Sequence, residues 1–165
     1  MKSTKILLVI TVLLISWAVL WKFNIPYIGS DQRVVNLSEP FKWNQLFEMI
    51  ANVLLFLPLG ILLSVFQSEK FSEGKNFAIW KQVISIIILS VFLETFQYVL
   101  ACGRSDITDL ILNTTGGVLG IIITKITLHL GGYPGRVALK TIALVIVIIA
   151  FILAGFSLEH LGYQF

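Results

Sequence analysis

Five apolar runs, each close to the length that crosses a bilayer, constrain the fold of this chain more than any other feature. They occupy residues 6–23, 46–66, 82–101, 107–130 and 137–158. A transmembrane helix needs about 20 predominantly apolar residues. Only 13% of the 165 residues are charged, whereas soluble proteins average roughly a quarter. The sequence therefore predicts an all-α membrane protein, a single domain over residues 1–165 with about five transmembrane helices.

The first apolar run, residues 6–23, allows two interpretations. Ser16 and Ala18 form a small-x-small pattern after an apolar stretch, which is typical of a signal-peptide cleavage site. The run continues apolar through Trp21, whereas signal segments end in polar residues. We expect an uncleaved first transmembrane helix, with cleavage as the alternative.

Composition argues against several kinds of site. The net charge is only +3, and the basic residues flank the apolar runs instead of forming a patch, so nucleic acid is not an expected partner. The single cysteine, Cys102, excludes an intramolecular disulfide and a cysteine-based metal site. His129 and His160 are far apart and lack the spacing of metal ligands. We expect no metal and no other cofactor.

The distribution of Lys and Arg predicts the orientation in the membrane. With a cytoplasmic N-terminus, the inner side carries eight basic residues and the outer side four, as the positive-inside rule favours. The inner residues are Lys2, Lys5, Lys70, Lys75, Lys81, Lys125, Arg136 and Lys140, and the outer residues are Lys22, Arg33, Lys42 and Arg104. The C-terminus is then expected outside.

Polar residues within the apolar runs gather near one predicted boundary. In this orientation the second run begins, the third ends and the fourth begins at the outer side. At about 1.5 Å of rise per residue, three pairs spaced at helical intervals lie within roughly 10 Å of that side: Glu48 and Asn52, Glu94 and Gln97, and Asp109 and Asn113. Because ionisable residues inside a membrane are costly and usually functional, we expect an outward-open polar cleft between these three runs.

The connection after the third run adds Arg104 and Asp106 to the predicted cleft. Arg104 lies between Glu94 and Asp109 in the sequence. We expect it to pair with Glu94 and to grip an anionic group through charge-assisted hydrogen bonds. For Asp106 two roles stay open, because a carboxylate at the start of a helix also caps backbone N–H groups.

Small residues recur in the second and fourth runs and favour helix packing. Gly116 and Gly120 form a small-xxx-small element next to Gly117, a pattern typical of closely approaching transmembrane helices. Gly60 follows Pro58 in the second run, and Pro58 removes one backbone hydrogen bond there. We assign all five residues to packing.

These residues alone do not decide whether the protein is an enzyme. Glu94 and Asp109 are the candidates for acid and base work. A nucleophile with its base is missing, since no serine or cysteine has a histidine close by in the sequence. We therefore favour a binding protein over an enzyme.

Residues 24–45 form the longest polar connection and also allow two interpretations. Tyr27, Phe41 and Trp43 are interleaved with polar residues. They predict either an aromatic belt at the level of the lipid headgroups or a flap that contacts a ligand.

The polar motifs resemble the VanZ-like family of small integral membrane proteins. The resemblance covers about residues 46–124 and rests on four spaced motifs: Asn52 to Pro58 and Gly60; Glu94 with Gln97; Arg104 with Asp106 and Asp109; and Asn113 with Gly116, Gly117 and Gly120. It implies a multi-pass protein of the bacterial plasma membrane, and the family's namesake is associated with resistance to the glycopeptide antibiotic teicoplanin. It implies no settled biochemical activity.

The resemblance and the predicted cleft together suggest a function at the cell envelope. We expect a protein that contacts membrane lipids, engages an anionic or lipid-linked envelope component and lowers susceptibility to glycopeptides such as teicoplanin. The alternative is a membrane-embedded enzyme that modifies such a component. A small transporter is less favoured, because the five runs show no internal repeat.

Overall fold

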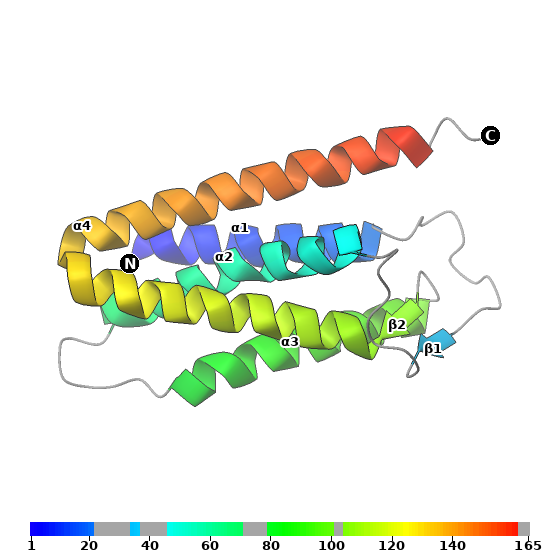
Figure 1. The fold of residues 1–165 in the computed structure, drawn as a ribbon, viewed down its shortest axis with the longest axis horizontal. Coiled ribbons are helices and arrows are strands. Elements are labelled where there is room, and N and C mark those ends of the chain that lie inside the picture. Colours follow the sequence, from blue (N-terminus) through cyan, green and yellow to red (C-terminus); the bar gives the residue numbers. More distant parts are fainter. Residues whose placement is uncertain (22–33, 37–45, 71–78, 101–103, 162–165) are drawn as a thin grey trace.

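The structure, a computed structural model, describes residues 1–21, 34–36, 46–70, 79–100 and 104–161. The helices in this part of the chain are α1 (Lys2–Trp21), α2 (Leu46–Lys70), α3 (Ile79–Leu100) and α4 (Ile107–Leu161) (Figure 1). Two short strands, β1 (Val34–Asn36) and β2 (Arg104–Asp106), accompany them. The predicted all-α fold is confirmed, and the strand pair is an addition that the sequence did not predict.

Helix α4 carries both the fourth and the fifth predicted helices. It is helical over 55 residues, and Figure 1 shows it folding back on itself at one end of the bundle. The expected break between residues 130 and 137 is therefore a bend within helical backbone. Pro134 lacks an N–H group, which is a common cause of kinks. Gly135 allows the two parts to approach, since a Cβ there would lie 3.0 Å from the Thr127 carbonyl oxygen. We call residues 107–130 the first limb and residues 137–161 the second limb.

Four helical segments among the described residues are long and apolar enough to span a membrane. They are Lys2–Val19, Met49–Lys70, Ile79–Leu100 and Ile107–Gly131. Successive segments run in alternating directions through the bundle (Figure 1). The fifth predicted span, residues 137–158, lies on the helical second limb and is not one of these four. The arrangement is that of a multi-pass membrane protein.

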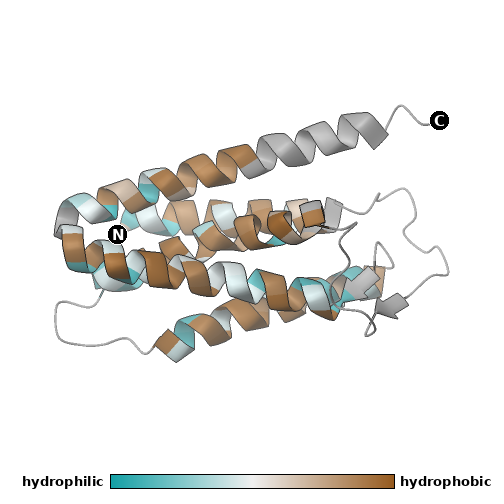
Figure 2. Ribbon diagram, viewed as in Figure 1, coloured by the Kyte–Doolittle hydropathy of each residue, from teal (hydrophilic) through white to brown (hydrophobic). Residues whose placement is uncertain are grey.

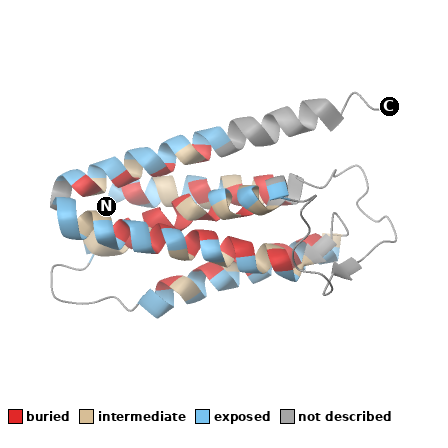
Figure 3. Cartoon of the chain, in the orientation of Figure 1, coloured by how far each residue is buried: buried red, intermediate tan, exposed pale blue. Residues whose placement is uncertain are grey.

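The distribution of polar side chains is the reverse of that in a soluble protein. Large apolar side chains are exposed, among them Leu13 and Ile88, each 63% exposed. Asn52, Gln97 and Asn113 are instead buried. Figures 2 and 3 show that much of the exposed helical surface is hydrophobic. Exposed apolar surface on this scale fits contact with lipid.

The short sheet joins two segments that are distant in sequence. β1 and β2 pair in parallel, with Val34 opposite Arg104, Val35 opposite Ser105 and Asn36 opposite Asp106. This links the α1–α2 connection to the α3–α4 connection. The rest of the α1–α2 connection, including Tyr27, Phe41 and Trp43, lies outside the described residues, so the choice between aromatic belt and flap stays open.

The apolar core consists of two clusters of buried side chains. The first joins α1, α2, α3 and the first limb through Ile15, Val19, Phe56, Leu59, Ile86, Leu93 and Ile121. The second joins α2 to the second limb through Ile61, Leu62, Val65, Leu139 and Ala143. Helix α2 contributes to both clusters, and α4 contributes through its first limb to one and through its second limb to the other.

Glycines bring α2 and the first limb of α4 into backbone contact. A Cβ at Gly60 would lie 2.0 Å from the Gly117 carbonyl oxygen, and a Cβ at Gly116 would lie 2.2 Å from the Val53 carbonyl oxygen. A Cβ at Gly120 would lie 2.3 Å from the carbonyl oxygen of Leu57. No larger residue fits these positions without moving a helix.

Replacing one of these glycines is expected to destabilise the protein. Gly60→Ala should lower the free energy of unfolding by about 1–3 kcal/mol, the usual cost of overpacking, although Ala is the better helix former. Denaturation of the purified protein in mixed micelles measures this. Gly131→Ala is the matched control, because Gly131 is helical and a Cβ there meets nothing within 4 Å. Equal stability of the two variants would contradict the packing role.

Candidate functional site

Helices α2 and α4 begin and α3 ends near the end of the bundle that carries the β1–β2 pair (Figure 1). Polar side chains of these three helices and of Asp106 form hydrogen bonds there. We call them the polar cluster and define it by its hydrogen-bonded residues. These are Asn52, Ser90, Glu94, Asp106, Asp109 and Asn113. The start of α4 therefore contacts both α2 and α3, the helices formed by the second and third apolar runs.

Asn52 and Asp109 connect α2 to α4. The Asn52 Nδ2 group donates a hydrogen bond to Asp109 Oδ1 across 57 positions of sequence. Asn52 is 3% exposed and Asp109 is half-buried. An amide donor and a carboxylate acceptor form a charge-assisted bond, so this pair fixes the position of one carboxylate within the cluster.

Glu94 and Asp106 connect α3 to the beginning of α4. The Asp106 backbone N–H donates to Glu94 Oε2 at 3.1 Å, and the Thr108 N–H donates to Asp106 Oδ1 at 2.9 Å. The second bond is an N-cap, in which a side chain satisfies a free N–H group in the first turn of a helix. Asp106 thus caps α4 while its backbone is held by α3.

Two further amides extend the polar layer between the helices. Asn113 Nδ2 donates to Ser90 Oγ at 3.0 Å, and Gln97 Nε2 donates to the Val19 carbonyl oxygen of α1 at 3.0 Å. Asn113 Oδ1 is buried and accepts no hydrogen bond among the described residues. Ser90 was not among the predicted site residues, although it lies four residues before Glu94 and so on the same helical face.

Part of the polar cluster is buried. Asn52, Ser90, Glu94 and Asn113 are buried, whereas Asp106 and Asp109 are half-buried. Their hydrogen bonds join α2 to α4 and α3 to the start of α4. The described residues contain no group of three or more His, Cys, Asp or Glu side chains placed to hold a metal ion.

Two predicted cleft residues have no described side chain. Glu48 belongs to α2 and Arg104 to β2, but their side chains lie outside the described part of the chain. The expected pairing of Glu94 with Arg104 therefore stays a prediction.

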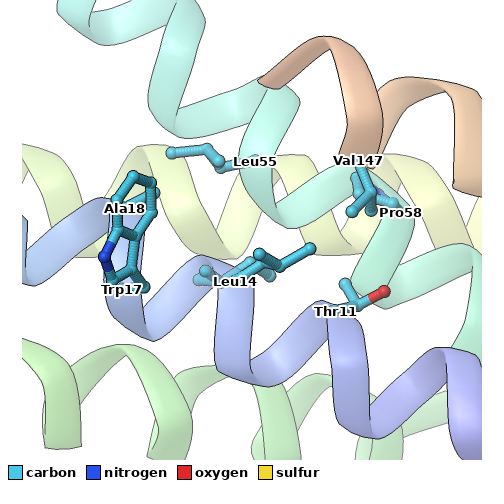
Figure 4. A pocket seen from close by; sticks show the side chains of 8 residues that line it. Thr11, Leu14, Trp17, Ala18, Leu55, Pro58 and Val147 are labelled. Carbon is cyan, nitrogen blue, oxygen red and sulfur yellow. The ribbon is translucent and has the colours of Figure 1, made fainter. Parts of the chain in front are cut away.

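Pro58 lies away from the polar cluster, in an apolar hollow between α1, α2 and the second limb of α4 (Figure 4). The other lining residues are Thr11, Leu14, Ile15, Trp17, Ala18, Leu55 and Val147. The hollow contains a single hydroxyl-bearing side chain and no charged one, so its surface suits hydrocarbon.

A second polar contact, which sequence analysis did not predict, lies near the other end of α2. Glu69 accepts hydrogen bonds from Lys140 Nζ and from Thr4 Oγ1, the latter at 2.7 Å. Lys140 also forms an ion pair with Glu69. These contacts tie α1 and the second limb to α2.

A comparison with protein families decides the relationship of this chain. The family model described as VanZ/LLP1 matches residues 7–128. The chain belongs to the VanZ/LLP1 family. The match includes α2, α3, most of the first limb of α4 and every residue of the polar cluster. It also reaches α1, which the sequence motifs had left out.

One curated member of the VanZ/LLP1 family shares substantial sequence with this chain. Protein VanZ of Enterococcus faecium is 35% identical over 118 residues, which is 70% of this chain and 69% of the relative. No solved structure matches the chain.

The contact between Asn52 and Asp109 is expected to contribute measurably to stability. A double-mutant cycle with Asn52→Ala and Asp109→Ala should give a coupling energy of roughly 0.5–1.5 kcal/mol, the range for hydrogen bonds between transmembrane helices. Unfolding in mixed micelles provides the four free energies. Thr115 is exposed and bonds only within α4, so a cycle of Asn52→Ala with Thr115→Ala should be additive. Additivity in both cycles would show that the contact contributes nothing.

Proposed function

We propose that this VanZ-family protein acts at the outer face of the bacterial plasma membrane. There its polar cluster engages a polar component of the cell envelope and thereby lowers susceptibility to glycopeptide antibiotics such as teicoplanin. The single observation that supports this most is the hydrogen-bonded cluster inside an otherwise apolar bundle. Polar and ionisable groups are costly in a membrane and are rarely kept there without a function.

The orientation in this proposal rests on charge. Eight of the 12 Lys and Arg residues belong to the side that is cytoplasmic if the N-terminus is inside, which follows the positive-inside rule. The starts of α2 and α4, which carry Asn52 and Asp109 of the polar cluster, lie at the opposite end of the bundle from the N-terminus and the α4 bend (Figure 1). The cluster would therefore face outward, toward envelope precursors and surface polymers.

The link to teicoplanin comes from the namesake of the family. The match to the E. faecium relative covers about two thirds of both chains, and the family match includes the whole cluster. We extend the association to this protein as part of the proposal. Arg104, two residues before Asp106 in β2, is the group we assign to an anionic part of the component, such as a phosphate, because guanidinium suits such oxygens.

A membrane-embedded enzyme is the second candidate, because Glu94 and Asp109 bring two carboxylates into one cluster. Each of them, however, accepts a hydrogen bond from a neutral donor, the Asp106 N–H and the Asn52 amide respectively. Those bonds use both carboxylates as acceptors that join neighbouring elements of the bundle. We therefore rank binding above catalysis.

Drug binding by intact cells tests the proposal. Cells that express the wild-type protein should bind less labelled teicoplanin than cells without it, and Asp109→Ala should abolish the difference because the α2–α4 contact at the cluster is lost. Thr115→Ala, matched for expression, should behave as wild type. Identical drug binding in wild-type and empty cells would contradict the proposed function.

Analysis of polar lipids and surface polymers in the same cells separates the two candidates. A binding protein leaves their chemistry unchanged. A new species that appears with the wild-type protein and disappears with Glu94→Gln would favour the enzyme, because the amide keeps the shape of the side chain but not its acid–base chemistry.

A further inference from the structure

The Glu94 carboxylate contacts the backbone at the start of α4. Its Oε2 accepts the Asp106 N–H at 3.1 Å, and the glutamate is 7% exposed. Asp106 is the last residue of β2 and directly precedes Ile107, the first residue of α4. One carboxylate therefore holds the junction between a strand and a helix.

The same junction carries the pairing with β1. Asn36 of β1 is opposite Asp106, and the register continues to Val34 opposite Arg104. β1 belongs to the connection between α1 and α2, so the bond from Glu94 links α3, through β2, to a segment about 60 residues earlier in the chain. The position of the Asp106 backbone therefore also determines the position of β1.

We infer that Glu94 is a positioning residue: its carboxylate anchors β2 to α3 and thereby holds β1 beside the polar cluster. The residue acts as a hydrogen-bond acceptor for a backbone N–H group. Neither acid–base chemistry nor direct contact with a ligand is its role. The consequence for binding rests on the proposed function, whereas the positioning itself does not.

Two features of the chain favour this role over a purely local one. Asp106 makes a second bond, from the Thr108 N–H to its own Oδ1 at 2.9 Å, so a shift of its backbone would also disturb the cap of α4. A parallel pair of only three residues per strand has little stability by itself. The short sheet therefore needs an anchor on one of the helices.

Disulfide formation between the strands tests the inference on purified protein without any drug. Val35→Cys and Ser105→Cys place two thiols at directly opposite positions, in a background where Cys102→Ser removes the native thiol. Neighbouring strands lie about 4.8 Å apart, within the Cα–Cα range of about 4.4–6.8 Å that a disulfide spans. Val35→Cys with Lys125→Cys is the matched negative pair, because Lys125 lies far along the first limb.

The Glu94 carboxylate is then replaced in the protein that carries Val35→Cys and Ser105→Cys. Glu94→Met keeps the length of the side chain but removes the acceptor, and we expect disulfide formation to be about tenfold slower, as expected for a lost hydrogen bond to a charged group. Glu94→Gln keeps a carbonyl acceptor and should crosslink within about twofold of the parent. Thr95→Val, at an exposed position whose hydroxyl bonds only within α3, should leave the rate unchanged.

Crosslinking at the parent rate in Glu94→Met would overturn the inference, and so would a Glu94→Gln rate as low as that of Glu94→Met. If Glu94→Met does not fold, Glu94→Asp replaces it, since the shorter carboxylate no longer reaches the Asp106 N–H and the same slowing is expected. Labelled-teicoplanin binding is measured separately with Glu94→Gln and Glu94→Met. Glu94→Gln should lower drug binding as the wild-type protein does, and Glu94→Met should not. Equal drug binding in the two variants, with crosslinking slowed only in Glu94→Met, contradicts the proposed function and leaves the positioning role intact.

Discussion

Backbone contact between α2 and the first limb of α4 is the constraint on which the rest of this structure depends. It exists because Gly60, Gly116 and Gly120 leave no side chain between the two helices. In a membrane, apolar side chains gain little by leaving lipid, so close van der Waals packing and interhelical hydrogen bonds must hold the helices together. The glycines allow the close van der Waals packing, and the short distance between the helices allows the hydrogen bonds.

The polar cluster follows from this close approach. Val53 lies against Gly116, so the neighbouring Asn52 is near enough for its short side chain to reach Asp109. Glu94 and Ser90, spaced one turn apart on α3, then reach Asp106 and Asn113. Three helices are tied together by polar bonds at one end, and Glu69 with Lys140 ties α2 to the second limb near the other. These polar side chains lie between the helices, whereas many large apolar side chains lie on the outer surface.

Sequence patterns predicted the parts of this arrangement that depend on local spacing. The apolar runs predicted the helices, and intervals of three and four residues brought Glu94, Asp109 and Asn113 onto faces that meet. The patterns did not predict partners set by helix rotation or by chain reversal. Val19 offers a backbone carbonyl to Gln97, which no side-chain pattern reveals, and Glu69 finds Lys140 only because α4 folds back. The β1–β2 pair was missed because three residues per strand show no alternation.

The central claim is that the polar cluster faces the outside of the cell, and the one native cysteine tests it directly. Cys102 lies two residues before Arg104, the first residue of β2, in the sequence. A membrane-impermeant thiol reagent applied to intact cells should label it, whereas Lys70→Cys in a Cys102→Ser background should react only after permeabilisation. Labelling of Cys102 only after permeabilisation, together with labelling of Lys70→Cys from outside, would place the cluster in the cytoplasm and contradict the account.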